Sequence, residues 1–159
     1  MALQWSTLAF DELSRDALYA VLRLRQQVFV IEQNCVYPDL DNKDQAAWHL
    51  LCCEDGELVA YLRCLSPGVS YEESALGRVV VEPRRRGREL GRELVARGVA
   101  FNLQRWPESD ICISAQAQLQ AFYQSLGFVA EGAEYLEDDM PHRKMRYAAG
   151  AGVIPPAET

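Results

Sequence analysis

Apolar residues near the start of the chain recur at the spacing of one helical face. Behind Ser14, which is suited to cap a helix, they are Leu18, Val21, Leu22, Val28 and Phe29. The pattern predicts a helix that begins after Ser14 and ends at Glu32. Arg25 falls inside the apolar stripe, so we expect it to have a carboxylate partner, because a buried charge is costly without one.

Alternating and continuous apolar runs farther along the chain predict strands and two more helices. The expected strands lie over 3–10, 48–54, 58–65, 75–81, 111–114, 128–131 and 142–147. The expected helices lie over 86–105 and 119–126. Asp55-Gly56 is a two-residue hairpin turn, and Gly127 is suited to end the second of these helices.

This order of strands and helices predicts a mixed α/β sheet in one domain. We expect the domain to span residues 1–147, since the chain has 159 residues and shows no repeat or linker. Glycines and paired prolines oppose regular structure, so we expect residues 148–159 to form a flexible tail.

The charge balance and the cysteines exclude several classes of protein. A net charge of −7 makes the chain a poor binder of nucleic acid or of an anionic membrane surface. No apolar run has the ~18 residues of a membrane span, and no leader is visible, so we expect a cytoplasmic protein. The five cysteines include the neighbours Cys52 and Cys53 but no CxxC spacing, which predicts buried thiols rather than a disulfide or a metal site.

The segment after the strand ending at Val81 combines glycines with an unusual density of positive charge. Five arginines lie within nine residues, at 84, 85, 86, 88 and 92. A helix N-terminus offers free N–H groups and a partial positive charge, glycines let a ligand approach the backbone, and arginines add bidentate donors. We interpret the turn as a site for a pyrophosphate. The alternative is a solvated basic patch, although clustered positive charge opposes the helix dipole.

A second informative segment contains Phe122-Tyr123 on the predicted short helix. A tyrosine hydroxyl is a weak acid with a pKa of about 10, and it can give a proton to a leaving thiolate. The alternative is that both aromatic rings only pack in the core.

Together these motifs resemble those of the GNAT N-acetyltransferase superfamily. The first is Arg86-Gly87-Arg88-Glu89-Leu90-Gly91 after a valine-rich strand and Pro83, and the second is Phe122 to Phe128. The segments over 28–35, 116–120 and 137–142 resemble the ElaA-like branch of that family. The sequence departs from the usual signature at Glu89, where a glycine is common, and at Gln116, which stands where an asparagine is often found.

The resemblance implies a single-domain acyl-CoA N-acyltransferase fold, with a mixed, mostly antiparallel, splayed sheet flanked by helices. It implies acetyl-CoA as the donor and no metal. The residues it places at the donor are Val79, Val80, Val81, Arg86, Gly87, Arg88, Glu89, Leu90, Gly91, Arg92, Gln116 and Tyr123.

The resemblance also implies direct attack of an amine on the thioester. Tyr123 is the expected acid for the departing thiolate, and a backbone N–H near Val80 is the expected donor to the oxyanion. For the base we consider Glu32, His49 and His142, or a chain of water molecules. For each of these side chains, the alternative is a structural or surface role without any part in catalysis.

We expect the acceptor to be a small-molecule or peptide amine, and the acidic stretches 39–41 and 137–139 would favour a cation. A non-catalytic acyl-CoA sensor and a nucleic-acid binder are the competing functions, the second opposed by the net charge. The sequence leaves open whether the chain forms a homodimer.

Overall fold

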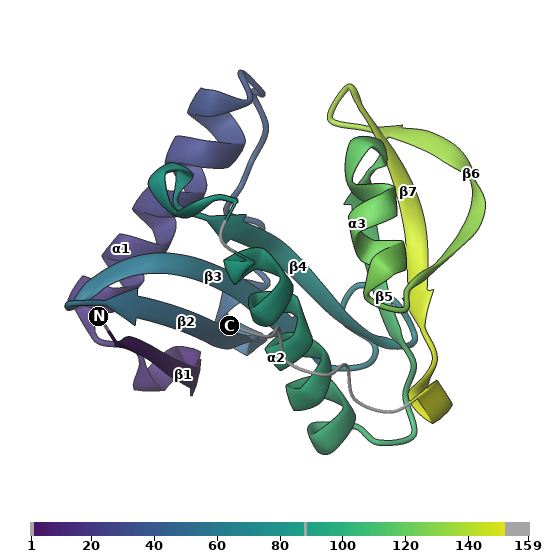
Figure 1. The fold of residues 1–159 in the computed structure, drawn as a ribbon, viewed down its shortest axis with the longest axis horizontal. Coiled ribbons are helices and arrows are strands. Elements are labelled where there is room, and N and C mark those ends of the chain that lie inside the picture. Colours follow the sequence, from purple (N-terminus) through teal and green to yellow (C-terminus); the bar gives the residue numbers. More distant parts are fainter. Residues whose placement is uncertain (1, 88, 152–159) are drawn as a thin grey trace.

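The computed structural model describes residues 2–87 and 89–151. Its strands are β1 (Leu3–Ala9), β2 (Trp48–Glu54), β3 (Glu57–Leu65), β4 (Ser74–Val81), β5 (Ile111–Gln116), β6 (Val129–Glu137) and β7 (Met140–Tyr147). Its helices are α1 (Arg15–Arg25), the π-helical η2 (Gln26–Glu32), α2 (Leu90–Arg105) and α3 (Gln120–Ser125), with short 3-10 turns η1 (Phe10–Glu12), η3 (Asp44–Ala46), η4 (Pro83–Arg85), η5 (Ala117–Leu119) and η6 (Ala149–Ala151). The strands form one sheet in the order β1-β2-β3-β4-β5-β7-β6, antiparallel except between β4 and β5 (Figure 1).

The local signals in the sequence set most of the element boundaries. The Ser14 hydroxyl accepts the N–H of Ala17, which confirms the predicted helix cap. Asp55 and Gly56 have φ angles of 52° and 80°, as the hairpin turn requires. Gly127 follows α3 with a φ of 103°, in the left-handed region that favours glycine.

Several predicted elements differ from those of the structure. The helix expected from Arg86 begins at Leu90, because Gly87 and Glu89 have φ angles of 79° and 61° and so interrupt helical geometry. The first helix changes to π-helical geometry after Arg25. The last two strands are longer than predicted, since most residues of β6 are exposed and their polar side chains give no strand pattern.

The expected tail is only partly described. Residues 152–159 lie outside the described residues. Before them, the N–H of Ala149 donates to Asp110 over 2.8 Å, so the first residues of the predicted tail are attached to the domain.

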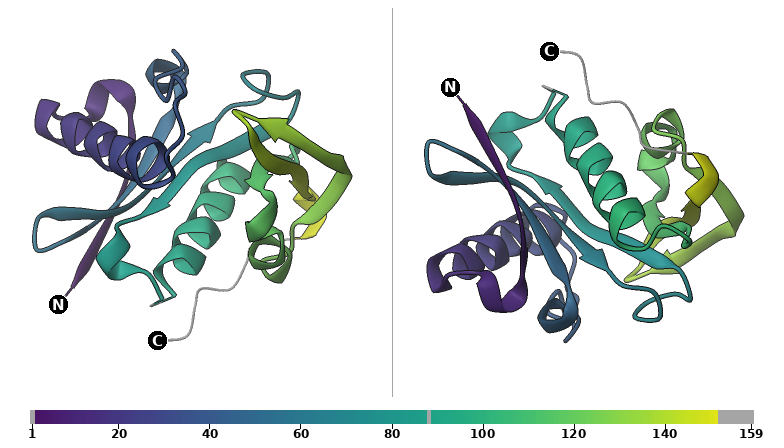
Figure 2. Two further views of the ribbon diagram at one scale, coloured as in Figure 1. Left: turned by 90° about the horizontal axis from the view of Figure 1, so that it is seen from above. Right: turned by 90° about the horizontal axis from the view of Figure 1, so that it is seen from below.

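The helices cover opposite faces of the first half of the sheet. Figure 2 shows α1 on one face of β2, β3 and β4 and α2 on the other. Along β3, Tyr61 packs with the residues of α1, whereas Ala60 and Leu62 belong to the larger core that α2 and α3 share. Alternate side chains of β3 therefore pack into two separate cores.

The sheet splays between its two central strands. Among the described residues, β4 and β5 pair only at Ser74 with Ile111 and at Ala75 with Cys112. Beyond these pairs the strands diverge, which leaves β1–β4 on one side and β5–β7 on the other (Figure 1). Buried Asn102 of α2 holds the point of divergence, because its Nδ2 donates to Ser74 Oγ (3.2 Å) and to the carbonyl of Ala75 (3.1 Å).

The cysteines are free thiols, and all except the half-buried Cys53 are buried. Among the described residues, no cluster of His, Cys, Asp or Glu side chains is arranged to hold a metal ion. No helix within the same residues is long and apolar enough to cross a membrane.

Candidate functional site

The open edge of β4 lies at the splay, and its backbone is irregular there. Tyr61 pairs with Val80 and Arg63 pairs with Gly77, so β4 has one residue more than β3 between these pairs. Within this bulge Arg78 has a φ of 52°, in the left-handed region. Bulges and left-handed non-glycine residues redirect side chains and are common at functional sites. The edge over Val79–Val81 therefore borders the splay directly after a bulge that changes the course of the backbone.

The turn predicted to bind a pyrophosphate lies at the end of this edge. α2 starts at Leu90, so its first N–H groups and the positive end of its dipole point toward the turn. A Cβ placed on Gly91 would lie 3.7 Å from Val81 Cγ2 and 3.8 Å from Phe122 Cζ, so the start of α2 contacts both sides of the splay. Glu89 is exposed and left-handed, the conformation that a glycine adopts at no steric cost.

The arginines of the turn differ in what they contact. Arg86 forms a bidentate pair with Glu32, with Nη1–Oε2 and Nη2–Oε1 distances of 3.0 and 2.7 Å. Arg85 pairs with Glu54 at 2.6 Å, and Arg92 donates to Ser125 Oγ at 3.2 Å. Arg84 is exposed, and Arg88 lies outside the described residues. The side chain of Arg86 would therefore have to leave Glu32 to reach a phosphate.

Glu32 and His49, the two favoured candidates for the base, are poorly placed for that role. The hydrogen bonds from Arg86 lower the pKa of Glu32, which makes its carboxylate a weaker base. His49 has no exposed surface, and burial lowers its pKa. Its Nε2 donates to the carbonyl of Asp44 (2.9 Å), and its Nδ1 accepts from the Tyr61 hydroxyl (2.6 Å). Both ring nitrogens of His49 thus form hydrogen bonds within the core, and its catalytic role stays a prediction that this geometry does not support.

Tyr123, the expected acid, lies on α3 with its ring in the core. It packs edge-on against Phe122 and Phe128, with ring centroids 5.1 and 5.7 Å apart. Burial raises the pKa of its hydroxyl, so the phenol stays protonated at neutral pH. No residue within 2–87 or 89–151 forms a hydrogen bond with that hydroxyl, which leaves it free to donate to a ligand. The aromatic packing and the acid role are compatible.

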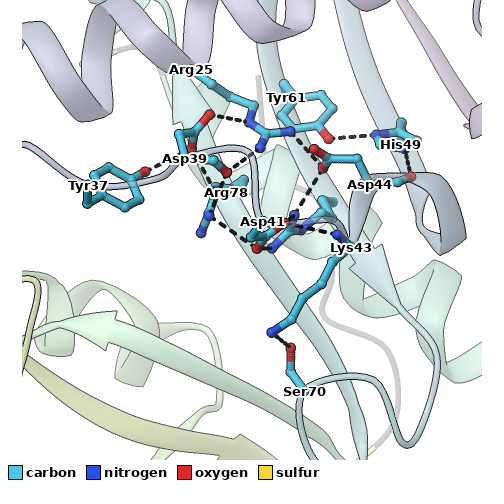
Figure 3. A network of polar contacts seen from close by, with 11 residues as sticks. Arg25, Tyr37, Asp39, Asp41, Lys43, Asp44, His49, Tyr61, Ser70 and Arg78 are labelled. Atoms are coloured by element: carbon cyan, nitrogen blue, oxygen red, sulfur yellow. Dashed lines mark hydrogen bonds and ion pairs between the residues drawn. The ribbon is translucent and has the colours of Figure 1, made fainter.

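A buried set of opposite charges, the arginine–aspartate cluster, supports the first half of the site (Figure 3). It comprises Arg25, Arg63 and Arg78 with Asp39, Asp41 and Asp44. Arg25 contacts Asp39 at 3.0 Å and Asp44 at 2.8 Å, which confirms its expected need for a carboxylate. The bulged Arg78 contacts Asp39 at 2.8 Å and Asp41 at 3.2 Å.

The cluster accounts for the aspartates of the acidic stretch 39–41. Three arginines face three aspartates, so the aspartates are neutralised inside the protein, and the expectation that this stretch attracts a cationic acceptor is wrong. Sequence reasoning missed Arg63 and Arg78. Both stand within predicted strands, where a charged residue among apolar neighbours indicates a buried ion pair, as it did for Arg25.

Two contacts join the halves of the sheet at the open end of the splay. The Gln116 side chain on β5 donates to the Gln33 side chain after η2 (3.0 Å). Cys35 Sγ contacts the carbonyl of Asp138 in the β6–β7 turn (3.6 Å). The segment 33–44, held by the arginine–aspartate cluster, therefore spans the splay and borders it on the side of α1.

Comparisons with known proteins agree with this geometry. The family model of the acetyltransferase (GNAT) domain matches residues 12–149. Protein ElaA of Escherichia coli is 41% identical over 142 residues, covering 88% of this chain and 93% of that protein. The crystal structure of E. coli ElaA has a TM-score of 0.86, covering 92% and 99% of the two chains. An acyl-CoA N-acyltransferase from Pseudomonas aeruginosa is 42% identical, with a TM-score of 0.88 and coverage of 92% and 100%.

The arginine–aspartate cluster yields a prediction about stability. Replacing Arg25 with Met removes one charge and leaves Asp39 and Asp44 buried with too little compensation, so R25M should lower the free energy of unfolding by about 3–5 kcal/mol. Urea unfolding measures this. The control is R84M, since Arg84 has an 87% exposed side chain and should change stability by no more than about 0.5 kcal/mol. Equal stabilities of the two variants would contradict the role of the cluster.

Proposed function

This chain belongs to the GNAT acetyltransferase family, and from that premise we propose that it moves the acetyl group of acetyl-CoA directly to a primary amine. The observation that carries the proposal is the splay, which lies beside the open edge of β4 and the turn before α2. The similarity to the P. aeruginosa N-acyltransferase supports transfer to nitrogen.

The turn before α2 and the edge of β4 lie next to each other and suit successive parts of coenzyme A. Backbone N–H groups from Arg86 to Gly91 would hold the pyrophosphate at the positive end of α2, with Arg86, Arg88 and Arg92 alongside. Gly87 allows close approach, because nothing lies within 4 Å of a Cβ placed there. The backbone of Val79–Val81 would pair with the pantetheine as a strand edge pairs with a peptide. Acetyl-CoA supplies an activated thioester at the end of this path.

The chain's own groups then serve the transfer. A backbone N–H near Val80 donates to the oxygen that gains charge as the amine attacks. Tyr123, kept protonated by its buried surroundings, gives a proton to the sulfur as the carbon–sulfur bond breaks. Arg86 contributes only after it exchanges Glu32 for a phosphate. Gln116, engaged with Gln33, borders the splay and would contact the donor from β5.

The role of Tyr123 is tested by Tyr123→Phe. The variant should bind acetyl-CoA like the parent protein but lose about 10²- to 10⁴-fold in kcat, because it removes only the proton donor. Thiol release is measured over a panel of amines that includes polyamines, amino acids and aminoglycosides, and binding is measured by thermal shift. Tyr19→Phe is the control, since Tyr19 is 72% exposed on α1. Saturable binding without turnover of any amine by the parent would favour an acyl-CoA sensor.

The ion pair between Glu32 and Arg86 predicts opposite effects on coenzyme A binding when one or the other residue is replaced. Arg86→Ala should weaken coenzyme A binding about 10- to 150-fold, the equivalent of a lost charge-assisted contact. Glu32→Gln should strengthen it by up to about 5-fold, because an exposed ion pair no longer competes for the guanidinium. Calorimetry measures both dissociation constants. In the Arg86→Ala background, Glu32→Gln should have no further effect, and an equal effect in both backgrounds would refute the competition.

A further inference from the structure

A second group of polar side chains lies on the other half of the splay. The Ser114–His142 cluster comprises Ser114 on β5, Tyr135 and Glu137 on β6, and His142 on β7. The Ser114 hydroxyl is hydrogen-bonded to the Tyr135 hydroxyl and donates to Glu137 (3.3 Å). The ring of Tyr135 stacks on His142, with centroids 6.2 Å apart, and Glu137 Oε2 lies 3.5 Å from His142 Nε2.

This cluster occupies the face of β5 that turns away from α3. Ile113 and Ala115 belong to the core that α3 covers, so Ser114 and Gln116 point to the opposite face. Gln116 pairs with His142, and directly paired residues share a face. Gln116 itself reaches Gln33, on the side of the splay where α1 ends. The cluster therefore lies on the face of β5 from which Gln116 contacts Gln33 across the splay.

The orientation of His142 is fixed by its backbone neighbour. Its Nδ1 lies 2.8 Å from the carbonyl of Met140. A carbonyl only accepts, so Nδ1 carries the proton, and Nε2 of the neutral ring keeps a free electron pair. The Glu137 carboxylate beside Nε2 becomes a favourable partner when Nε2 gains a proton. The ring is therefore held in one orientation with a basic nitrogen, and the nearby carboxylate favours the positive charge that the ring gains with a proton.

The strand register places His142 level with the reactive part of the β4 edge. In both β4–β5 pairs the β5 residue is 37 positions later, since 111 − 74 and 112 − 75 both give 37. Continued past the splay, that offset puts Val79 level with Gln116, and the extra residue of the β4 bulge moves this level toward Val80. The partner of Gln116 is His142. A group held at Val79–Val80 would lie across the open space from the imidazole.

We propose that His142 Nε2 is the general base for the acceptor amine, an assignment that rests on the proposed function. The bound ammonium gives one proton to Nε2, and the freed nitrogen lone pair forms the bond to the thioester carbon. The carbon–sulfur bond breaks with its electron pair on sulfur, which takes the proton of Tyr123. The nitrogen's second proton leaves through solvent and balances the one that Tyr123 regains, while His142 returns the first proton to solvent.

Glu137 is a positioning residue in this scheme, because it acts on the imidazolium and not on the substrate. Ser114 donates a hydrogen bond to Glu137. Lys144, two residues along β7, pairs instead with Glu131 (3.6 Å) and lies over the Tyr71 ring. His142 keeps 11% of its side chain exposed, whereas His49 is fully buried. Of the chain's two histidines, His142 is the one whose side chain keeps some exposed surface.

The test combines a variant with a measurement that needs no turnover. In His142→Ala, kcat should fall about 10²- to 10⁴-fold, the acidic limb of the kcat/KM profile should disappear, and added imidazole should restore rate. Glu137→Gln should shift that limb, a change that a merely structural role would not cause. Arg143→Gln is the matched control, since the neighbouring side chain points to the other face of β7. Nitrogen-15 spectra of the free protein should show His142 in the Nδ1–H form.

Two results would overturn the assignment. They are a His142→Ala variant with the rate and pH profile of the parent, and an Nε2–H tautomer of His142. A parent protein that binds acetyl-CoA but acylates no amine would instead contradict the proposed function and remove the reaction in which His142 would act.

Discussion

Two residue pairs join β4 to β5, and the rest of the molecule depends on the pairing stopping there. Each strand has a partner on its other side, so the sheet stays intact while its centre opens. Asn102 fixes the point of divergence by bonding to Ser74 and Ala75. Past that point, within the part of the chain that the structure describes, the edge of β4 has no neighbouring strand to pair with its backbone N–H and C=O groups. It therefore suits an elongated ligand with amide groups.

The first half of the sheet carries charged side chains beside the splay, and ion pairs within the protein satisfy them. Arg78 lies within the bulge and Arg63 beside it, and both are held by aspartates from the segment after η2. Burial alone would raise the pKa of Asp44, but hydrogen bonds from Arg25 and Arg63 hold it below its ordinary value. The same interactions that stabilise the bulge thus attach the segment that borders the splay.

Features that depend on a few neighbouring residues could be predicted from the sequence. The Ser14 cap, the Asp55-Gly56 turn, the end of α3 at Gly127 and the need of Arg25 for a carboxylate are all of this kind. The pairing of Glu32 with Arg86 joins residues far apart in sequence, and so does the packing that encloses His49. No local pattern carries that information. His142 is one of several bases that the sequence leaves open, and only strand register shows that it pairs with Gln116, whose side chain contacts Gln33.

The most direct test of the proposed site is a crystal structure of the protein with coenzyme A. We expect the pyrophosphate on the backbone N–H groups between Arg86 and Gly91, the pantetheine along Val79–Val81, and the sulfur beside the Tyr123 hydroxyl. Coenzyme A bound away from the splay, or a Tyr123 hydroxyl directed away from the sulfur, would contradict it.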